Sequence, residues 1–179
     1  MVLMSHMKKI VFVILALGLS LNGSVVFGEG LSSHDIIQRI ASEGMVLQAH
    51  DKLSFYIPQG WIVQAQDNQK YNFRVPYHLG VGGFIQVKSQ SVSIETILSE
   101  LTSQTKIEFI ELSKGEFLAT NLIGSLHLYT GRFGGEVWHF LVITALRVSG
   151  EQVIFFAQAP ATWFGVYELL FMDIARVIA

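Results

Sequence analysis

Histidines are the first residues of this 179-residue chain whose chemistry demands a test, because imidazole is the commonest metal ligand and general base in proteins. No HExxH motif occurs, no histidine is followed directly by glutamate, and the chain has no cysteine to supply a thiolate. We therefore predict no metal site and interpret the histidines as scattered surface or half-buried side chains. Those that follow the N-terminal segment are His34, His50, His78, His127 and His139.

Two of these histidines flank a predicted hairpin. The glycine pair at 134–135 joins two runs rich in β-branched and aromatic residues, which is typical of a two-residue hairpin turn. In that register His139 lies opposite Thr130, and His127 lies opposite Val142. Because side chains alternate along a strand, the two imidazoles are expected on opposite faces of the sheet.

Nucleophilic and acid–base chemistry is not indicated either. G-x-S-x-G is missing, and Ser125 in IGSLHL lies inside a predicted strand instead of on a strand-to-helix elbow. Glu108, Glu111 and Glu116 flank a predicted turn, where a solvated patch is commoner than a paired acid and base. GVGGF at 80–84 lacks the G-x-G-x-x-G spacing and is interpreted as a loop or bulge. We predict no catalytic residue and no cofactor.

Aromatic residues make up 12% of the chain and offer a ligand or partner surface. An ordinary core is the competing interpretation, because alternating aromatics in strands and a helical stripe also build a single core. A pocket would be lined by Phe84, Phe117, Trp138, Phe155, Phe156, Trp163 and Phe164. The residues chosen for a possible ligand or partner surface are Trp61, Trp138, Phe156 and Trp163.

Trp61 follows the turn residues 58–60 in SFYIPQGWIV. Alternation places Trp61, Val63 and Ala65 on one face of the following strand. We interpret the ring as a structural element that covers one edge of the core, with its indole N–H still reaching water or a carbonyl.

The elements that must position these residues are short helices and extended runs. Ser33 can cap a helix that stops at Gly44, and Ser93 can cap another. The closing stretch has an apolar stripe at helical spacing, made by Trp163, Tyr167, Leu170, Ile174 and Val177. Turn residues at 114–115, 134–135 and 149–150 are expected to separate a meander of long strands. The extended runs are 53–57, 61–65, 71–75, 84–88, 107–112, 116–131, 136–148 and 151–159. This order predicts an α+β fold whose central antiparallel sheet has about six or seven strands flanked by helices.

The N-terminus is typical of an export signal. Lys8 and Lys9 precede a twelve-residue apolar run at 10–21, shorter than the roughly 20 residues of a spanning helix. We predict a signal peptide at 1–28, with cleavage after Gly23 as an alternative and an uncleaved anchor as another. Residues 29–179 are then a single domain. The net charge of −2 gives no reason to expect a nucleic-acid partner, and without cysteine there are no disulfides and no lipid-modified cysteine.

Three stretches resemble the PsbP-like group of domains: IPQGW at 57–61, the helix SIETILSELTSQ at 93–104, and GEQVIFFAQAP at 150–160. The likeness covers about 46–179. It implies a sandwich built on an antiparallel sheet and used mostly for binding, with no catalytic residues to carry over. Similar domains form the tail of some exported zinc metalloproteases, whose HExxH half is absent here.

We therefore expect an exported, non-enzymatic accessory domain, periplasmic or secreted in a bacterium, that acts through a partner protein at the cell envelope. Membrane contact is expected only through the signal segment if it is uncleaved. Two alternatives stay open: a small-molecule or lipid-binding module with an aromatic pocket, and a domain associated with a hydrolase.

Overall fold

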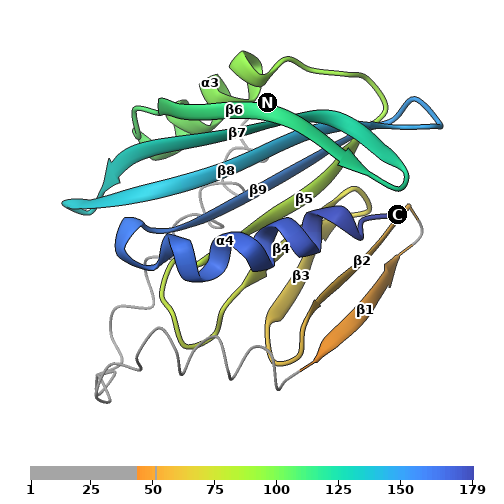
Figure 1. Cartoon of the computed structure of the whole chain (residues 1–179), viewed down its shortest axis with the longest axis horizontal. Coiled ribbons are helices and arrows are strands. Elements are labelled where there is room, and N and C mark those ends of the chain that lie inside the picture. Colours follow the sequence, from red (N-terminus) through yellow and green to blue (C-terminus); the bar gives the residue numbers. More distant parts are fainter. Residues whose placement is uncertain (1–43, 51) are drawn as a thin grey trace, which may run out of the picture.

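The structure is a computed structural model that describes residues 44–50 and 52–179. The predicted signal peptide and the predicted helix from Ser33 lie outside the described residues. The described residues form nine strands and two helices, in the order shown in Figure 1. They are β1 (Met45–His50), β2 (Leu53–Pro58), β3 (Ile62–Asp67), β4 (Lys70–Arg74), β5 (Gly82–Lys88), α3 (Ile94–Thr105), β6 (Ile110–Ala119), β7 (Leu122–Phe133), β8 (Glu136–Arg147), β9 (Gln152–Pro160) and α4 (Ala161–Arg176). Neither of these two helices is long and apolar enough to cross a membrane.

The strands form two antiparallel sheets. β1 and β2 make a two-stranded ribbon, and the other seven strands have the order β3-β4-β5-β9-β8-β7-β6. The predicted α+β fold with a central antiparallel sheet is thus confirmed, although β1 was not among the predicted strands. The turn after β2 does not make a hairpin, because β2 pairs with β1 and β3 pairs with β4. Gly60, at φ +86°, turns the chain from the ribbon into the large sheet.

The meander β6 to β9 follows the predicted order with one error. The β7–β8 register places Thr130 opposite His139 and His127 opposite Val142, as predicted. The predicted turn at 114–115 is wrong, because β6 runs through these residues. The chain turns instead at 120–121, which divides the predicted run 116–131 between β6 and β7. Gly115 lies on an edge strand with open space around it, where a missing side chain costs little packing.

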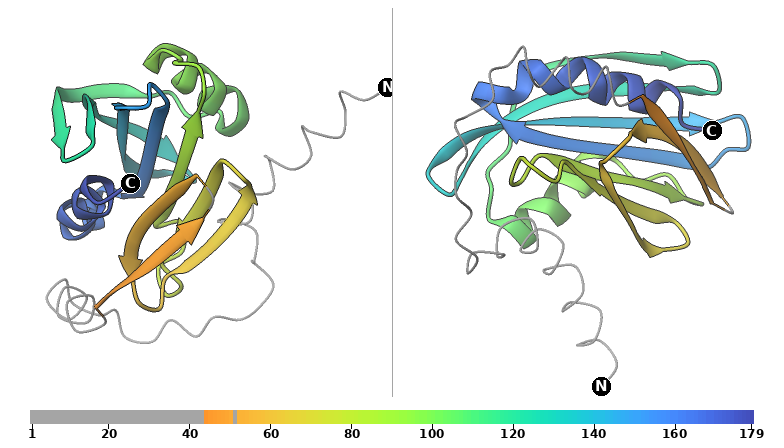
Figure 2. Two further views of the ribbon diagram at one scale, coloured as in Figure 1. Left: turned by 90° about the vertical axis from the view of Figure 1, so that its right-hand side faces the viewer. Right: turned by 90° about the horizontal axis from the view of Figure 1, so that it is seen from below.

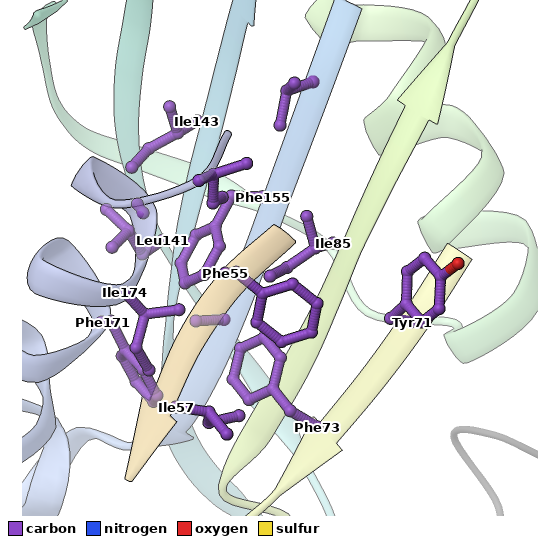
Figure 3. Packing of buried hydrophobic residues seen from close by; sticks show 14 of the residues in the cluster. Phe55, Ile57, Tyr71, Phe73, Ile85, Leu141, Ile143, Phe155, Phe171 and Ile174 are labelled. Carbon is purple, nitrogen blue, oxygen red and sulfur yellow. The ribbon is translucent and has the colours of Figure 1, made fainter. Parts of the chain in front are cut away.

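The two helices lie on opposite sides of the seven-stranded sheet (Figure 2). On the α4 face, α4 and β2 cover the larger core, part of which Figure 3 shows around Phe55, Phe73 and Phe155. On the α3 face, a smaller cluster joins Ile97 and Leu101 of the helix to aromatic side chains of β8 and β9. Each face of the sheet therefore has its own apolar layer.

The buried stripe of α4 is rotated from the predicted one. Tyr167 and Ile174 are buried as expected, but Leu170 is half-buried and Val177 is 42% exposed. Apolar side chains occur around most of this helix, so two different apolar stripes have helical spacing. The stripe that carries two phenylalanines is the one that packs on the sheet. The buried stripe consists of Phe164, Tyr167, Phe171, Ile174 and Ile178.

Polar contacts cap the start of helix α3 and anchor the segment that precedes it. The Ser93 hydroxyl accepts a hydrogen bond from the Thr96 backbone N–H at 3.3 Å, which confirms the predicted cap. Gln152 of β9 is only 4% exposed, and its amide bonds both the N–H and the C=O of Val92 at 2.9 Å. These bonds hold the segment before α3 against the sheet.

Candidate functional site

A continuous row of hydrogen bonds joins side chains of β6, β7 and β8 on the α3 face. His127 Nδ1 lies 3.0 Å from Glu111 Oε2, and His127 Nε2 lies 3.1 Å from Ser125 Oγ. Ser125 Oγ lies 3.1 Å from Thr144 Oγ1, and the Tyr129 hydroxyl donates to Glu111 Oε2 at 3.3 Å. We call these five residues the Ser125 cluster.

Strand geometry explains why these side chains meet. Ser125, His127 and Tyr129 are alternate residues of β7, so they point to one face, and the β7–β8 register places Thr144 opposite Ser125. A bulge in β6 between Glu111 and Ser113 brings Glu111 opposite Tyr129. Without this extra residue, alternation would turn Glu111 to the α4 face. The cluster therefore depends on a one-residue irregularity in an edge strand.

The carboxylate of Glu111 determines where the protons of the Ser125 cluster lie. The hydrogen bond from His127 is the largest cause that holds the pKa of Glu111 below its usual range, and burial followed by the charge of Glu111 raises the pKa of Tyr129 to about 12. Ionised Glu111 only accepts, so His127 carries its proton on Nδ1. In the form with a proton on Nδ1 alone, His127 Nε2 accepts from the Ser125 hydroxyl, and Ser125 Oγ then accepts from Thr144. This is the order of bonds in which a serine nucleophile is paired with a base that a carboxylate orients.

An exposed apolar row adjoins the cluster. Leu118, Ile123 and Leu146 are 64%, 70% and 47% exposed and lie side by side on β6, β7 and β8. Ile123 is two residues from Ser125 and Leu146 two residues from Thr144, so the row shares their face. We call these three residues the apolar row. Contiguous exposed apolar patches are a common feature of interaction surfaces.

Trp61 lies in the core and not on a site. Its ring is 7% exposed and its centroid lies 6.1 Å from that of Phe73, 6.2 Å from that of Tyr167 and 6.3 Å from that of Phe171. The ring covers the core as predicted. The prediction for the indole N–H is wrong, because Trp61 Nε1 is buried and has no acceptor among the described residues.

The four aromatic residues predicted as a possible surface are not brought together. Trp138 and Phe156 are 6% and 5% exposed in the cluster on the α3 face. Trp61 and Trp163 pack on the α4 face, where Trp163 is half-buried against His78. The larger set of pocket residues is divided in the same way, with Phe84 on the α3 face and Phe155 on the α4 face.

The histidines are dispersed as expected. His127 and His139 face opposite sides of the sheet, and His139 packs against Phe164 of α4. His50 stacks on Tyr71 with 4.1 Å between ring centroids, and His78 Nδ1 lies 3.2 Å from the Tyr167 hydroxyl. Within residues 44–50 and 52–179, no three histidine, aspartate or glutamate side chains are placed to hold a metal ion. His34 lies outside the described residues.

Glu111 corrects the interpretation of the acidic residues. The sequence pattern placed Glu108, Glu111 and Glu116 in a solvated patch beside a turn. Glu111 is exposed as predicted, but it lies within a strand and its carboxylate is bonded to a histidine. Ser125 does lie inside a strand, as predicted, and its contact with His127 was missed. The spacing S-x-H on a strand could have indicated that contact, whereas nothing local indicates Glu111.

A hollow of about 410 Å³ lies where the ribbon meets the end of β8. Arg147 reaches into it and donates to the backbone oxygens of Lys52 at 2.8 Å and Ala179 at 2.9 Å. Ser54 and Ala179 are also joined by two backbone hydrogen bonds of 2.8 Å. Arg147 Nε and His50 Nε2, which also belong to the lining, are buried without a hydrogen-bond partner in the described part of the chain. The side chains of the Ser125 cluster, in contrast, are joined to one another by hydrogen bonds.

Comparison with known proteins places the fold. No protein-family model and no curated protein sequence matches the chain. The solution structure of cyanobacterial PsbP from Synechocystis sp. PCC 6803 is similar, with a TM-score of 0.60 and 11% identity over 89% of this chain and 98% of that one. A crystal structure from Bacteroides thetaiotaomicron gives a TM-score of 0.51 and 11% identity over 76% of this chain and 48% of that one. At this identity the likeness concerns the fold alone, and the chain has the PsbP-like fold that its sequence resemblance predicted.

Proposed function

We propose that this chain is an exported accessory domain that works by binding a partner protein at the cell envelope, without enzymatic turnover of its own. The observation that carries the proposal is the apolar row, where Leu118, Ile123 and Leu146 are exposed side by side on three adjacent strands. β7 and β8 are paired with strands on both sides, so this surface would lose little backbone entropy when a partner binds.

A protein partner suits this surface better than a small molecule. The row lies on the face of a sheet, whereas small-molecule sites are concave and enclose most of their ligand. Glu116, Ser125 and Thr144 border the row and supply a polar rim of the kind found around apolar interface centres. On the α4 face, Tyr167 and Phe171 fill the contact between α4 and the sheet and are 0% exposed.

Export is supported by the N-terminal sequence, in which Lys8 and Lys9 precede the apolar run at 10–21. The chain isolated from a periplasmic or secreted fraction is expected to begin at Glu29, or at Ser24 if cleavage follows Gly23. N-terminal sequencing of that chain tests the expectation, and an intact N-terminus found only in the cytoplasm would contradict it.

The docking test compares two matched substitutions. Ile123→Glu places a charge in the apolar row, and Leu169→Glu places the same charge at a 74% exposed position on α4, on the other side of the sheet. The wild-type chain and both variants are immobilised in parallel, incubated with an envelope fraction and compared by quantitative mass spectrometry. We expect a protein that wild type and Leu169→Glu retain equally and that Ile123→Glu retains about ten-fold less. Equal retention by all three would refute the proposed surface.

A further inference from the structure

We propose that Ser125 is an activated nucleophile that accepts an acyl group from an ester and holds it as acyl-serine. The proposal goes beyond partner binding, because it concerns a covalent reaction of the chain itself. It stands on the positions of three side chains: Ser125 Oγ is 3.1 Å from His127 Nε2, and His127 Nδ1 is 3.0 Å from Glu111 Oε2. A nucleophile bonded to a base that a third group orients is the arrangement that serine hydrolases use.

Ser125 and His127 are held by their neighbours, whereas the Glu111 side chain is 42% exposed and is held by its two hydrogen bonds. Ser125 and His127 project from a strand that is paired on both sides, and the His127 side chain is 11% exposed. The His127 ring lies nearly parallel to that of Tyr129, at 8° with 6.0 Å between centroids. Tyr129 also donates to Glu111, so the carboxylate that orients the imidazole is itself oriented. Preorganised groups of this kind react without first rearranging.

The surface beside Ser125 indicates the class of acyl donor. Ser125 is half-buried, and the next side chain on its face along β7 is Ile123, which is 70% exposed. A short aliphatic acyl chain would lie on the apolar row while its carbonyl carbon meets Ser125 Oγ. We therefore assign esters of short aliphatic acids as the substrate class.

The reaction is an acyl transfer. Ser125 Oγ attacks the carbonyl carbon, and its proton moves to His127 Nε2. The bond from that carbon to the leaving oxygen then breaks, and the leaving group departs with the electron pair. His127 returns its proton to the leaving group or to water, so atoms and charge balance and no further reactant is needed.

The strand location of Ser125 also limits the chemistry. Its backbone lies between β6 and β8, so its N–H is used in the sheet and does not form an oxyanion hole. Removal of a single oxyanion donor costs enzymes about 10²–10³-fold in rate. Only esters with a good leaving group are therefore expected to react, and the acyl-serine should hydrolyse slowly. The site is expected to take up one acyl group per chain without rapid turnover.

The test uses p-nitrophenyl butyrate and the full chain. We expect release of one nitrophenolate per chain, a mass increase of one butyryl group, and the group mapped to Ser125 by peptide mass spectrometry. Ser113 is the internal control, because it is an exposed serine on the neighbouring strand that has no histidine bonded to it. Labelling at Ser125 should be at least about 10²-fold faster than at Ser113, which is the usual gain from a general base.

Two variants separate the proposal from adventitious acylation. Ser125→Ala should abolish the mapped adduct, and His127→Gln should slow it by about 10²-fold or more while circular dichroism stays that of wild type. His139→Gln, which replaces the histidine on the opposite face, should leave the rate unchanged. Equal rates at Ser125 and Ser113, no adduct at Ser125, or an unchanged rate in His127→Gln would each overturn the proposal.

Glu111 acts as a positioning residue, so its test needs a readout other than rate. Imidazole nitrogen NMR should place the proton of His127 on Nδ1 in the wild-type chain. Glu111→Gln should redistribute that proton between the two ring nitrogens, because the substituted amide no longer demands a donor. An unchanged proton position in Glu111→Gln would show that Glu111 does not orient the imidazole. None of these measurements involves an envelope partner, so their outcome is independent of the docking test.

Discussion

Substitution of Trp61 tests how the buried indole contributes to stability, because its ring and its N–H act in opposite directions. The ring is 7% exposed and lies against Phe73, Tyr167 and Phe171, so Trp61→Ala is expected to lower the free energy of unfolding by about 3–5 kcal/mol. The N–H is buried and has no acceptor in the described part of the chain. An unpaired buried donor costs about 1–3 kcal/mol.

Trp61→Phe separates these contributions. It leaves a gap of roughly 40 Å³, which costs about 1 kcal/mol at about 24 cal/mol per Å³, and the lost apolar burial costs about as much again. It also removes the unpaired donor and recovers about 1–3 kcal/mol. The net change in the free energy of unfolding is therefore expected to lie within about 1 kcal/mol of zero.

Urea unfolding followed by far-UV circular dichroism measures both Trp61 variants without depending on tryptophan fluorescence. Trp163→Phe is the matched control, because Trp163 is half-buried on the same face of the sheet and its nitrogen is not among the buried unpaired atoms. A loss in Trp61→Phe as large as that in Trp61→Ala would refute the reasoning, since it would mean that the indole N–H is satisfied in the folded chain.

Two further predictions concern buried polar groups. Gln152→Leu is expected to lower the free energy of unfolding by about 1–3 kcal/mol in urea, because the N–H and C=O of Val92 both lose their partner, whereas exposed Gln64→Leu should change it by less than about 0.5 kcal/mol. Equal effects of these two variants would contradict the anchoring role of Gln152. Burial lowers the pKa of His78 from 6.5, so its contribution to stability is present above that pH and is lost as the pH falls through the lowered value. The stability advantage of wild type over His78→Gln should therefore shrink between pH 8 and pH 5 in urea titrations, and an advantage that grows in acid would show the opposite shift.

The correct predictions rest on signals that act over a few neighbouring residues. The glycine pair at 134–135 has φ values of +59° and +87°, which few other residues adopt, so the turn and the register of both strands follow from it. Ser93 likewise satisfies an N–H only three residues away. All the residues that determine such a turn or cap lie within a few positions of one another, so the local sequence is enough to predict it.

The incorrect predictions concern features that are determined by contacts between residues far apart in the sequence. Gly115 was interpreted as a turn residue, but glycine is also tolerated in an exposed edge strand, and only the sheet order shows that β6 is an edge. The stripe of α4 was rotated because its spacing allows two apolar faces. The contact of Phe164 and Phe171 with the sheet core selects between them, and that contact is not encoded in the helix alone.

The Ser125 cluster is the feature that the sequence alone predicts least well. The S-x-H pattern places Ser125 and His127 on one face of any strand, so half of the arrangement is present in three consecutive residues. Glu111 reaches that face only because β6 carries one extra residue between Glu111 and Ser113. A strand without the bulge would present Glu111 to the α4 face and leave His127 without an acid, although the composition and hydrophobic pattern would hardly differ. Whether this chain holds an oriented histidine is therefore decided by sheet pairing and not by residue types or spacing.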